Sequence, residues 1–156
     1  MHVRPGNPRW LLAAGGVMVL GAVAHLLAPL GGPAWYQALG APPGLAVMAA
    51  AGSMRPAITC VVIATLLLAC AAFAFSGAGR RRPLPLLRPA LAAIGVGLLV
   101  RGLVFIPLAA WRPRLLSGLC GRCEGANAFV WITSLLCLLL AAAYLHGAWA
   151  LPRRAR

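Results

Sequence analysis

The chain has 156 residues, of which 62% are hydrophobic and only 10% are charged, and its mean hydropathy is +0.90. Soluble domains contain about 45–50% apolar and about 25% charged residues, so a soluble fold would leave too much apolar surface in water. The basic residues are all arginines and the only acid is Glu124, which gives a net charge of +13. Such a charge can indicate nucleic-acid binding. Here the arginines lie between apolar segments and no aromatic side chains are interleaved for base stacking, so we expect no nucleic-acid partner.

Four segments are long and apolar enough to cross a bilayer, which requires about 20 mostly apolar residues in a helix. They cover residues 10–30, 57–75, 89–110 and 127–151. The first begins like a signal peptide with a small-residue cleavage site at Ala22-Val23-Ala24, but its apolar character continues to Leu30 and we expect it to stay. The sequence therefore predicts an all-α fold: one integral membrane domain over residues 1–156, built as a four-helix bundle.

The arginines are distributed unevenly between the two sides of the predicted bundle. Cytoplasmic loops carry an excess of Lys and Arg. One side holds Arg4, Arg9, Arg80, Arg81, Arg82, Arg88, Arg153, Arg154 and Arg156, and the other holds Arg55, Arg112, Arg114 and Arg122. Both termini are therefore predicted to be cytoplasmic, with Arg80, Arg81 and Arg82 resting on anionic lipid headgroups. Arginine in place of lysine, with abundant Ala, Gly and Pro, is typical of a GC-rich bacterial genome, which predicts the inner (plasma) membrane.

The first outer loop, residues 31–55, is broken by Gly31-Gly32-Pro33 and Ala41-Pro42-Pro43-Gly44. The stretches between these breaks, Trp35–Leu39 and Leu45–Ala51, are apolar enough to lie in the membrane interface as short helices. We therefore predict interfacial helical segments in this loop.

Arg101 lies near the middle of the third span, about 17–20 Å from either end of the helix. An arginine at this depth costs about 2.5–3.5 kcal/mol or more, and usually faces the bundle interior or a wet cavity. No Asp or Glu lies in any predicted span, so neutral groups must surround it. We predict a polar layer of Arg101 with His25, Thr65 and Ser134. Arg101 is then a structural tie, a ligand-binding arginine, or a contact to another subunit.

Small residues along the third span, including Ala93, Gly97 and Gly102, predict close approach to a neighbouring helix. A metal site is not expected. His25 and His146 should lie near opposite faces of the membrane, and a lone pair of cysteines lacks the further ligands that zinc needs.

Cys120-Gly121-Arg122-Cys123 lies just before the fourth span, on the predicted outer side. The CxxC pair predicts a structural disulfide, unpaired thiols or a redox pair whose thiolate Arg122 would favour. Four helices with an outer CxxC resemble in outline two quinone-linked families, the bacterial disulfide-forming membrane oxidoreductases and the vitamin K epoxide reductases. Both families use a second outer cysteine pair, whereas residues 31–55 contain none and Cys60 supplies at best half of one.

Four short motifs are similar to those of a group of small bacterial four-helix membrane proteins of unknown function. They are Leu39-Gly40-Ala41-Pro42, Ser76-Gly77-Ala78-Gly79, Leu84-Pro85-Leu86-Leu87-Arg88 and Leu99-Val100-Arg101-Gly102-Leu103. This resemblance implies a fold class and no activity. Our leading hypothesis is a non-enzymatic bundle that serves as an accessory subunit or binds a lipid or small ligand around Arg101, without a cofactor. The alternative is a membrane thiol–disulfide oxidoreductase that uses Cys120 and Cys123, with a quinone held near Arg101.

Overall fold

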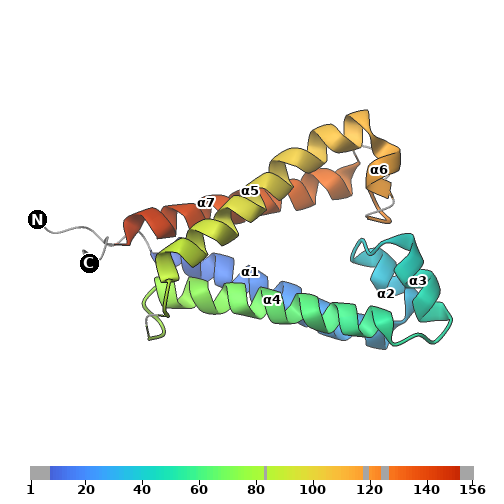
Figure 1. Cartoon of the computed structure of the whole chain (residues 1–156), viewed down its shortest axis with the longest axis horizontal. Helices are drawn as coiled ribbons and strands as arrows, with labels where there is room; N and C mark the ends of the chain where they lie inside the picture. The colour runs from blue at the N-terminus through green and yellow to red at the C-terminus, as the bar shows by residue number, and fades with distance from the viewer. Residues whose placement is uncertain (1–7, 83, 118–119, 124–126, 152–156) are drawn as a thin grey trace, which may run out of the picture.

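The chain folds into four long helices, joined by short helices and loops (Figure 1). The computed structural model describes residues 8–82, 84–117, 120–123 and 127–151, and no strand occurs in these ranges. The long helices are α1 (Pro8–Leu27), α4 (Arg55–Gly77), α5 (Leu87–Trp111) and α7 (Ala128–Ala150). Each is long and apolar enough to cross a membrane, and each leaves large apolar side chains exposed on its surface. The protein is therefore a multi-pass membrane protein, and the predicted all-α four-helix fold is confirmed.

The third span is one uninterrupted helix, α5, with Arg101 and Pro107 inside it. The sequence-based bounds of all four spans lie within a few residues of the observed ones. At the start of α7 the side chain of Asn127 accepts a hydrogen bond from the Val130 amide at 3.1 Å. This N-cap satisfies one of the amides that a helix leaves without an internal partner.

Short helices occupy the connections at one end of the bundle. They are the 3₁₀-helix η1 (Ala28–Gly31) and the α-helices α2 (Pro33–Ala38), α3 (Pro43–Ala50) and α6 (Pro113–Ser117). Each of the three α-helices begins with a proline. Proline is favoured at this position because the backbone N–H that it lacks would have no partner within the helix. Two of them, α2 and α3, fall where the sequence predicted helical segments in the first outer loop.

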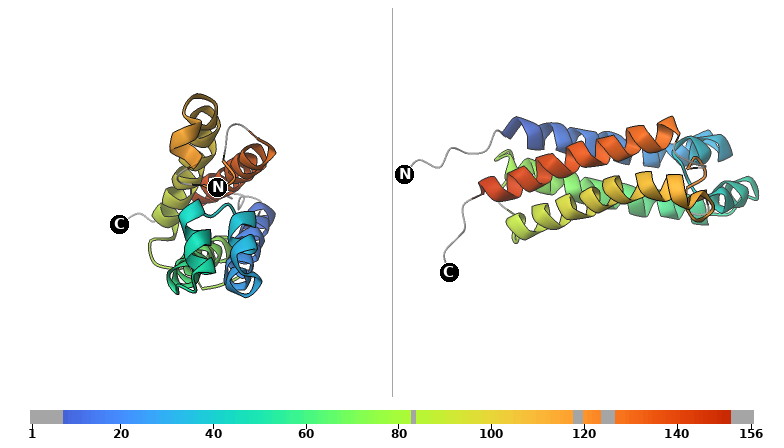
Figure 2. Two further views of the ribbon diagram at one scale, coloured as in Figure 1. Left: turned by 90° about the vertical axis from the view of Figure 1, so that its right-hand side faces the viewer. Right: turned by 90° about the horizontal axis from the view of Figure 1, so that it is seen from above.

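The long helices associate as two pairs, α1 with α4 and α5 with α7 (Figures 1 and 2). The pairs lie close together at the end where α1 begins and α7 ends, which we call the terminal end. They diverge toward the opposite end, which we call the loop end and which carries α2, α3 and α6. The bundle is therefore a wedge.

A hydrophobic core joins all four helices in the half of the wedge nearer the terminal end. Its buried members are Leu11, Ala14, Met18, Ala71, Ala74, Leu91, Leu140, Ala143, Tyr144 and Ala148. Tyr144 is fully buried, and its hydroxyl donates a hydrogen bond to the Cys70 carbonyl at 2.9 Å. This bond runs from α7 to α4 and so ties one helix pair to the other.

The link between the two pairs, from α4 to α5, is fixed by side chains at its two ends. The Ser76 hydroxyl donates to the Arg82 carbonyl at 3.0 Å and accepts from the Leu84 amide at 3.1 Å. Arg88 Nε donates to the Ala148 carbonyl at 3.1 Å. The arginines between these anchors, Arg80 to Arg82, are exposed. Their contact with anionic headgroups stays a prediction.

Candidate functional site

Arg101 is partly buried on α5, and its guanidinium carbon lies 3.2 Å from the centroid of the Phe105 ring. The two residues are four apart, so their side chains share one face of the helix. The arginine side chain therefore reaches about one turn toward the loop end. Its Nη1 atom is buried and has no hydrogen-bond partner among the described residues. The cation–π contact with Phe105 partly stabilises the charge of the guanidinium, but it provides no hydrogen-bond acceptor for Nη1.

Ser134 on α7 lies at the same level of the α5–α7 pair. A Cβ added to Gly102 would come 3.0 Å from the Ser134 carbonyl oxygen, so the backbones approach closely here. Ser134 is fully buried, and its hydroxyl also lacks a partner among the described residues. The α5–α7 pair thus holds two buried polar atoms without partners.

His25 and Thr65, the other two residues of the predicted polar layer, form hydrogen bonds within their own helices. His25 Nδ1 lies 2.7 Å from the Gly21 carbonyl oxygen. Thr65 is exposed, and its hydroxyl donates to the Val61 carbonyl at 2.8 Å. The structure therefore brings Arg101 and Ser134 to one helix pair, whereas His25 on α1 and Thr65 on α4 belong to the other. Their participation in a polar layer stays a prediction.

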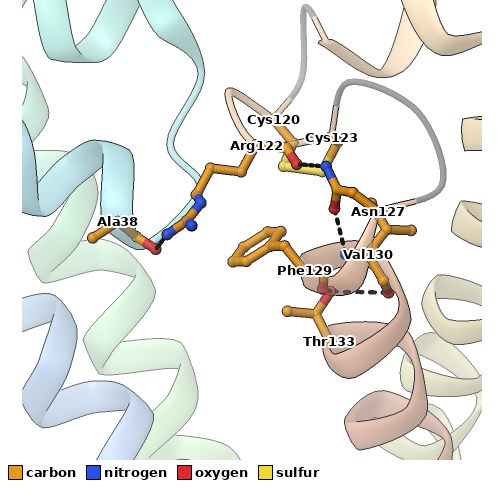
Figure 3. Close-up of a disulfide and its surroundings, with 8 residues drawn as sticks. All are labelled: Ala38, Cys120, Arg122, Cys123, Asn127, Phe129, Val130 and Thr133. Atoms are coloured by element: carbon orange, nitrogen blue, oxygen red, sulfur yellow. Dashed lines mark hydrogen bonds between the residues drawn. A yellow bond between two sulfur atoms is a disulfide. The ribbon is translucent and has the colours of Figure 1, made fainter.

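Cys120 and Cys123 form a disulfide, with their Cα atoms 5.3 Å apart (Figure 3). Both are buried, with 7% of Cys120 and 0% of Cys123 exposed. They belong to a cluster with Ala109, Leu116 and Val130, against which Phe105 also packs. Phe105 therefore contacts the Arg101 guanidinium and the disulfide cluster. Because thiol–disulfide exchange requires access to a sulfur atom, this burial favours a structural bridge.

The disulfide loop docks on the segment between α2 and α3, across the open side of the wedge. The Gly121 amide donates to the Ala41 carbonyl at 3.1 Å, and Arg122 Nη1 donates to the Ala38 carbonyl at 3.4 Å. Figure 3 shows Arg122 reaching from the disulfide loop to Ala38 above the Phe129 ring. Gly40 has a φ of 77°, and a Cβ added there would lie 2.7 Å from that ring. We call this set of contacts the loop-end clasp.

The other cysteines are free thiols and do not form a second pair. Cys60, Cys70 and Cys137 are unbonded. Cys60 is buried in a small cluster with Ala28 and Tyr36, where burial raises the pKa of the Tyr36 phenol above its usual range. No group of His, Cys, Asp or Glu able to hold a metal ion occurs among the described residues.

Two features of the site escaped the sequence-based reasoning. The Arg101–Phe105 contact has a recognisable signal, since an arginine and an aromatic residue four apart on a helix meet on one face. The loop-end clasp has none, because its hydrogen bonds to Ala38 and Ala41 use backbone carbonyls that every residue carries.

No protein-family model, curated protein or solved structure matches the chain. The two candidate functional regions are the α5–α7 pair around Arg101 and the loop-end clasp.

Proposed function

We propose that the protein is a non-enzymatic membrane protein that binds a lipid or small amphiphile through an oxyanion or carbonyl group at Arg101. The observation that supports this proposal is the buried Nη1 atom of Arg101, which has no partner among the described residues. A buried donor without an acceptor costs about 1–3 kcal/mol, and more when it is charged. A ligand oxygen at this position would remove that cost.

The composition of the spans determines what kind of ligand fits. The four long helices contain no Asp or Glu, so nothing within them neutralises the guanidinium. A planar guanidinium offers parallel N–H groups that match a carboxylate or phosphate. The buried hydroxyl of Ser134, on the facing helix, supplies a second donor at the same level. An anionic headgroup with an apolar body satisfies both donors and remains in the bilayer.

The test is native mass spectrometry of the protein extracted in mild detergent, with Arg101→Leu and Arg101→Lys beside wild type. We expect a bound lipid or ligand in wild type and occupancy about tenfold or more lower in Arg101→Leu, since a hydrogen bond to a charged group contributes about 1.5–3 kcal/mol. Arg101→Lys should lose occupancy as well, because a point charge cannot reproduce the planar fork.

Arg55→Leu provides the matched control, because it removes an arginine at the edge of a span. It should leave occupancy unchanged. Equal occupancy in all variants, or none in wild type, would show that Arg101 is a structural tie between helices and does not bind a ligand.

The redox alternative has one supporting observation, the contact of Phe105 with Arg101 and with the disulfide cluster. A quinone beside Phe105 would lie near both groups. The burial of Cys123 weighs against it. A reduction potential of the pair between about −270 and −120 mV would favour catalysis, and one below about −300 mV would favour a structural bridge.

A further inference from the structure

A cavity of about 690 Å³ lies at the loop end between α2, α3 and the disulfide loop. We call it the loop-end pocket. Its walls are mostly apolar and include Pro33, Ala34, Pro43, Ala46, Val47 and Ala50. Gln37 and Arg122 contribute the polar side chains. No residue of α5 or α7 lines it, so this pocket is separate from Arg101 and its surroundings.

Among the described residues that line the pocket, Arg122 is the only charged one. A guanidinium carries five N–H donors, and one of them bonds to the Ala38 carbonyl at 3.4 Å. The others have no hydrogen-bond partner among the described residues, and its guanidinium carbon lies 5.2 Å from the Phe129 ring centroid. The described part of the chain contains no acidic residue, so nothing there neutralises this charge. The described part of the pocket therefore combines an apolar wall with one guanidinium.

The disulfide loop holds Arg122 in this position. The Arg122 carbonyl accepts a hydrogen bond from Asn127 Nδ2 at 2.7 Å, and the neighbouring Gly121 amide is bonded to Ala41. The Cys120–Cys123 bond closes the loop on either side of these two residues. These contacts fix the backbone of Arg122, so less backbone entropy is lost when its side chain binds a ligand.

We propose that the loop-end pocket binds an anionic membrane lipid, with the lipid phosphate on Arg122 and the adjoining glycerol and acyl carbons on the apolar wall. The charge of the site favours an anion, and a phosphate matches the guanidinium fork. A phospholipid also covers the apolar wall, which a free phosphate ion leaves exposed. The net charge of +13 also favours anionic over neutral lipids as neighbours of the chain.

The experiment titrates detergent-solubilised protein with phosphatidylglycerol, phosphatidylcholine or inorganic phosphate, and reads occupancy by native mass spectrometry. Wild type should bind phosphatidylglycerol more tightly than phosphatidylcholine or phosphate. Arg122→Gln should weaken that binding about tenfold or more, the equivalent of one charge-assisted hydrogen bond. The matched control, Arg114→Gln, removes an exposed arginine of α6 that does not line the pocket, and should bind as wild type does.

A second readout places the lipid. Phosphatidylglycerol should slow amide hydrogen exchange in residues 33–50 of wild type, and this protection should be lost in Arg122→Gln. The proposal is overturned if Arg122→Gln binds as tightly as wild type, or if phosphatidylcholine or free phosphate binds as tightly as phosphatidylglycerol. Arg101→Leu separates the two sites. If Arg101→Leu abolishes lipid binding and Arg122→Gln does not affect it, the lipid binds at Arg101. That result would overturn the proposed loop-end site and leave the proposed function at Arg101 intact.

Discussion

Two glycines of α5, Gly97 and Gly102, differ in whether they pack against another helix. Gly102 faces α7, where an added Cβ would lie 2.8 Å from the Leu138 side chain, whereas at Gly97 nothing lies within 4 Å. The sequence predicted close helix approach at both. That prediction is confirmed for Gly102 and wrong for Gly97, and Gly95 makes the second contact, with Leu145. Because α5 is apolar on all sides, its composition does not reveal which face meets a partner.

We predict opposite effects for alanine at these two positions. Gly102→Ala should lower the free energy of unfolding by about 1–3 kcal/mol, since the new methyl group forces α5 and α7 apart. Gly97→Ala should leave it unchanged or raise it by up to about 1 kcal/mol, because alanine restricts the unfolded chain. Reversible unfolding in mixed micelles measures both changes. Equal destabilisation of the two variants would show that α5 does not meet α7 along the face that contains Gly102.

At the scale of helices and loops, the sequence predicts the spans well because spanning depends on length and composition alone. It does not predict how the spans pair. The Tyr144 hydroxyl bonds to the Cys70 carbonyl in the core, and no pattern in the sequence indicates this contact. Gly40 appeared only within the short motif Leu39-Gly40-Ala41-Pro42, yet it packs against Phe129 in the loop-end clasp. Both roles depend on contacts between residues far apart in the chain. Because every helix face is apolar, the sequence pattern does not indicate which residues make these contacts.

The disulfide loop gives a prediction at this scale. Replacing both Cys120 and Cys123 with serine should lower the free energy of unfolding by about 2 kcal/mol or less, since the bond closes a very short loop. The backbone hydrogen bond from Gly121 to Ala41 should keep the loop docked. Thermal unfolding of the double variant measures the change. Loss of a cellular disulfide-forming activity in this variant would instead support the redox alternative.

For the whole molecule, the arginine distribution predicts that the loop end faces outward and the terminal end faces the cytoplasm. Cysteines introduced as Gln37→Cys and Pro85→Cys, in a background without native cysteines, test this. Both positions are exposed and uncharged, so the arginine pattern is preserved. A membrane-impermeant thiol reagent applied to intact cells should label position 37 and spare position 85. The reverse pattern would invert the protein and place the disulfide on the reducing side.

The pairing of helices also bears on how the protein is made. Residues 8–77 contain one complete pair and residues 87–150 the other. At about 5–20 residues per second of synthesis, α1 and α4 can associate in the membrane before α7 has left the ribosome. We expect the second pair to join the first through the core around Tyr144. Each half of the chain would then assemble as a separate step, with the exposed Arg80, Arg81 and Arg82 in the link between them.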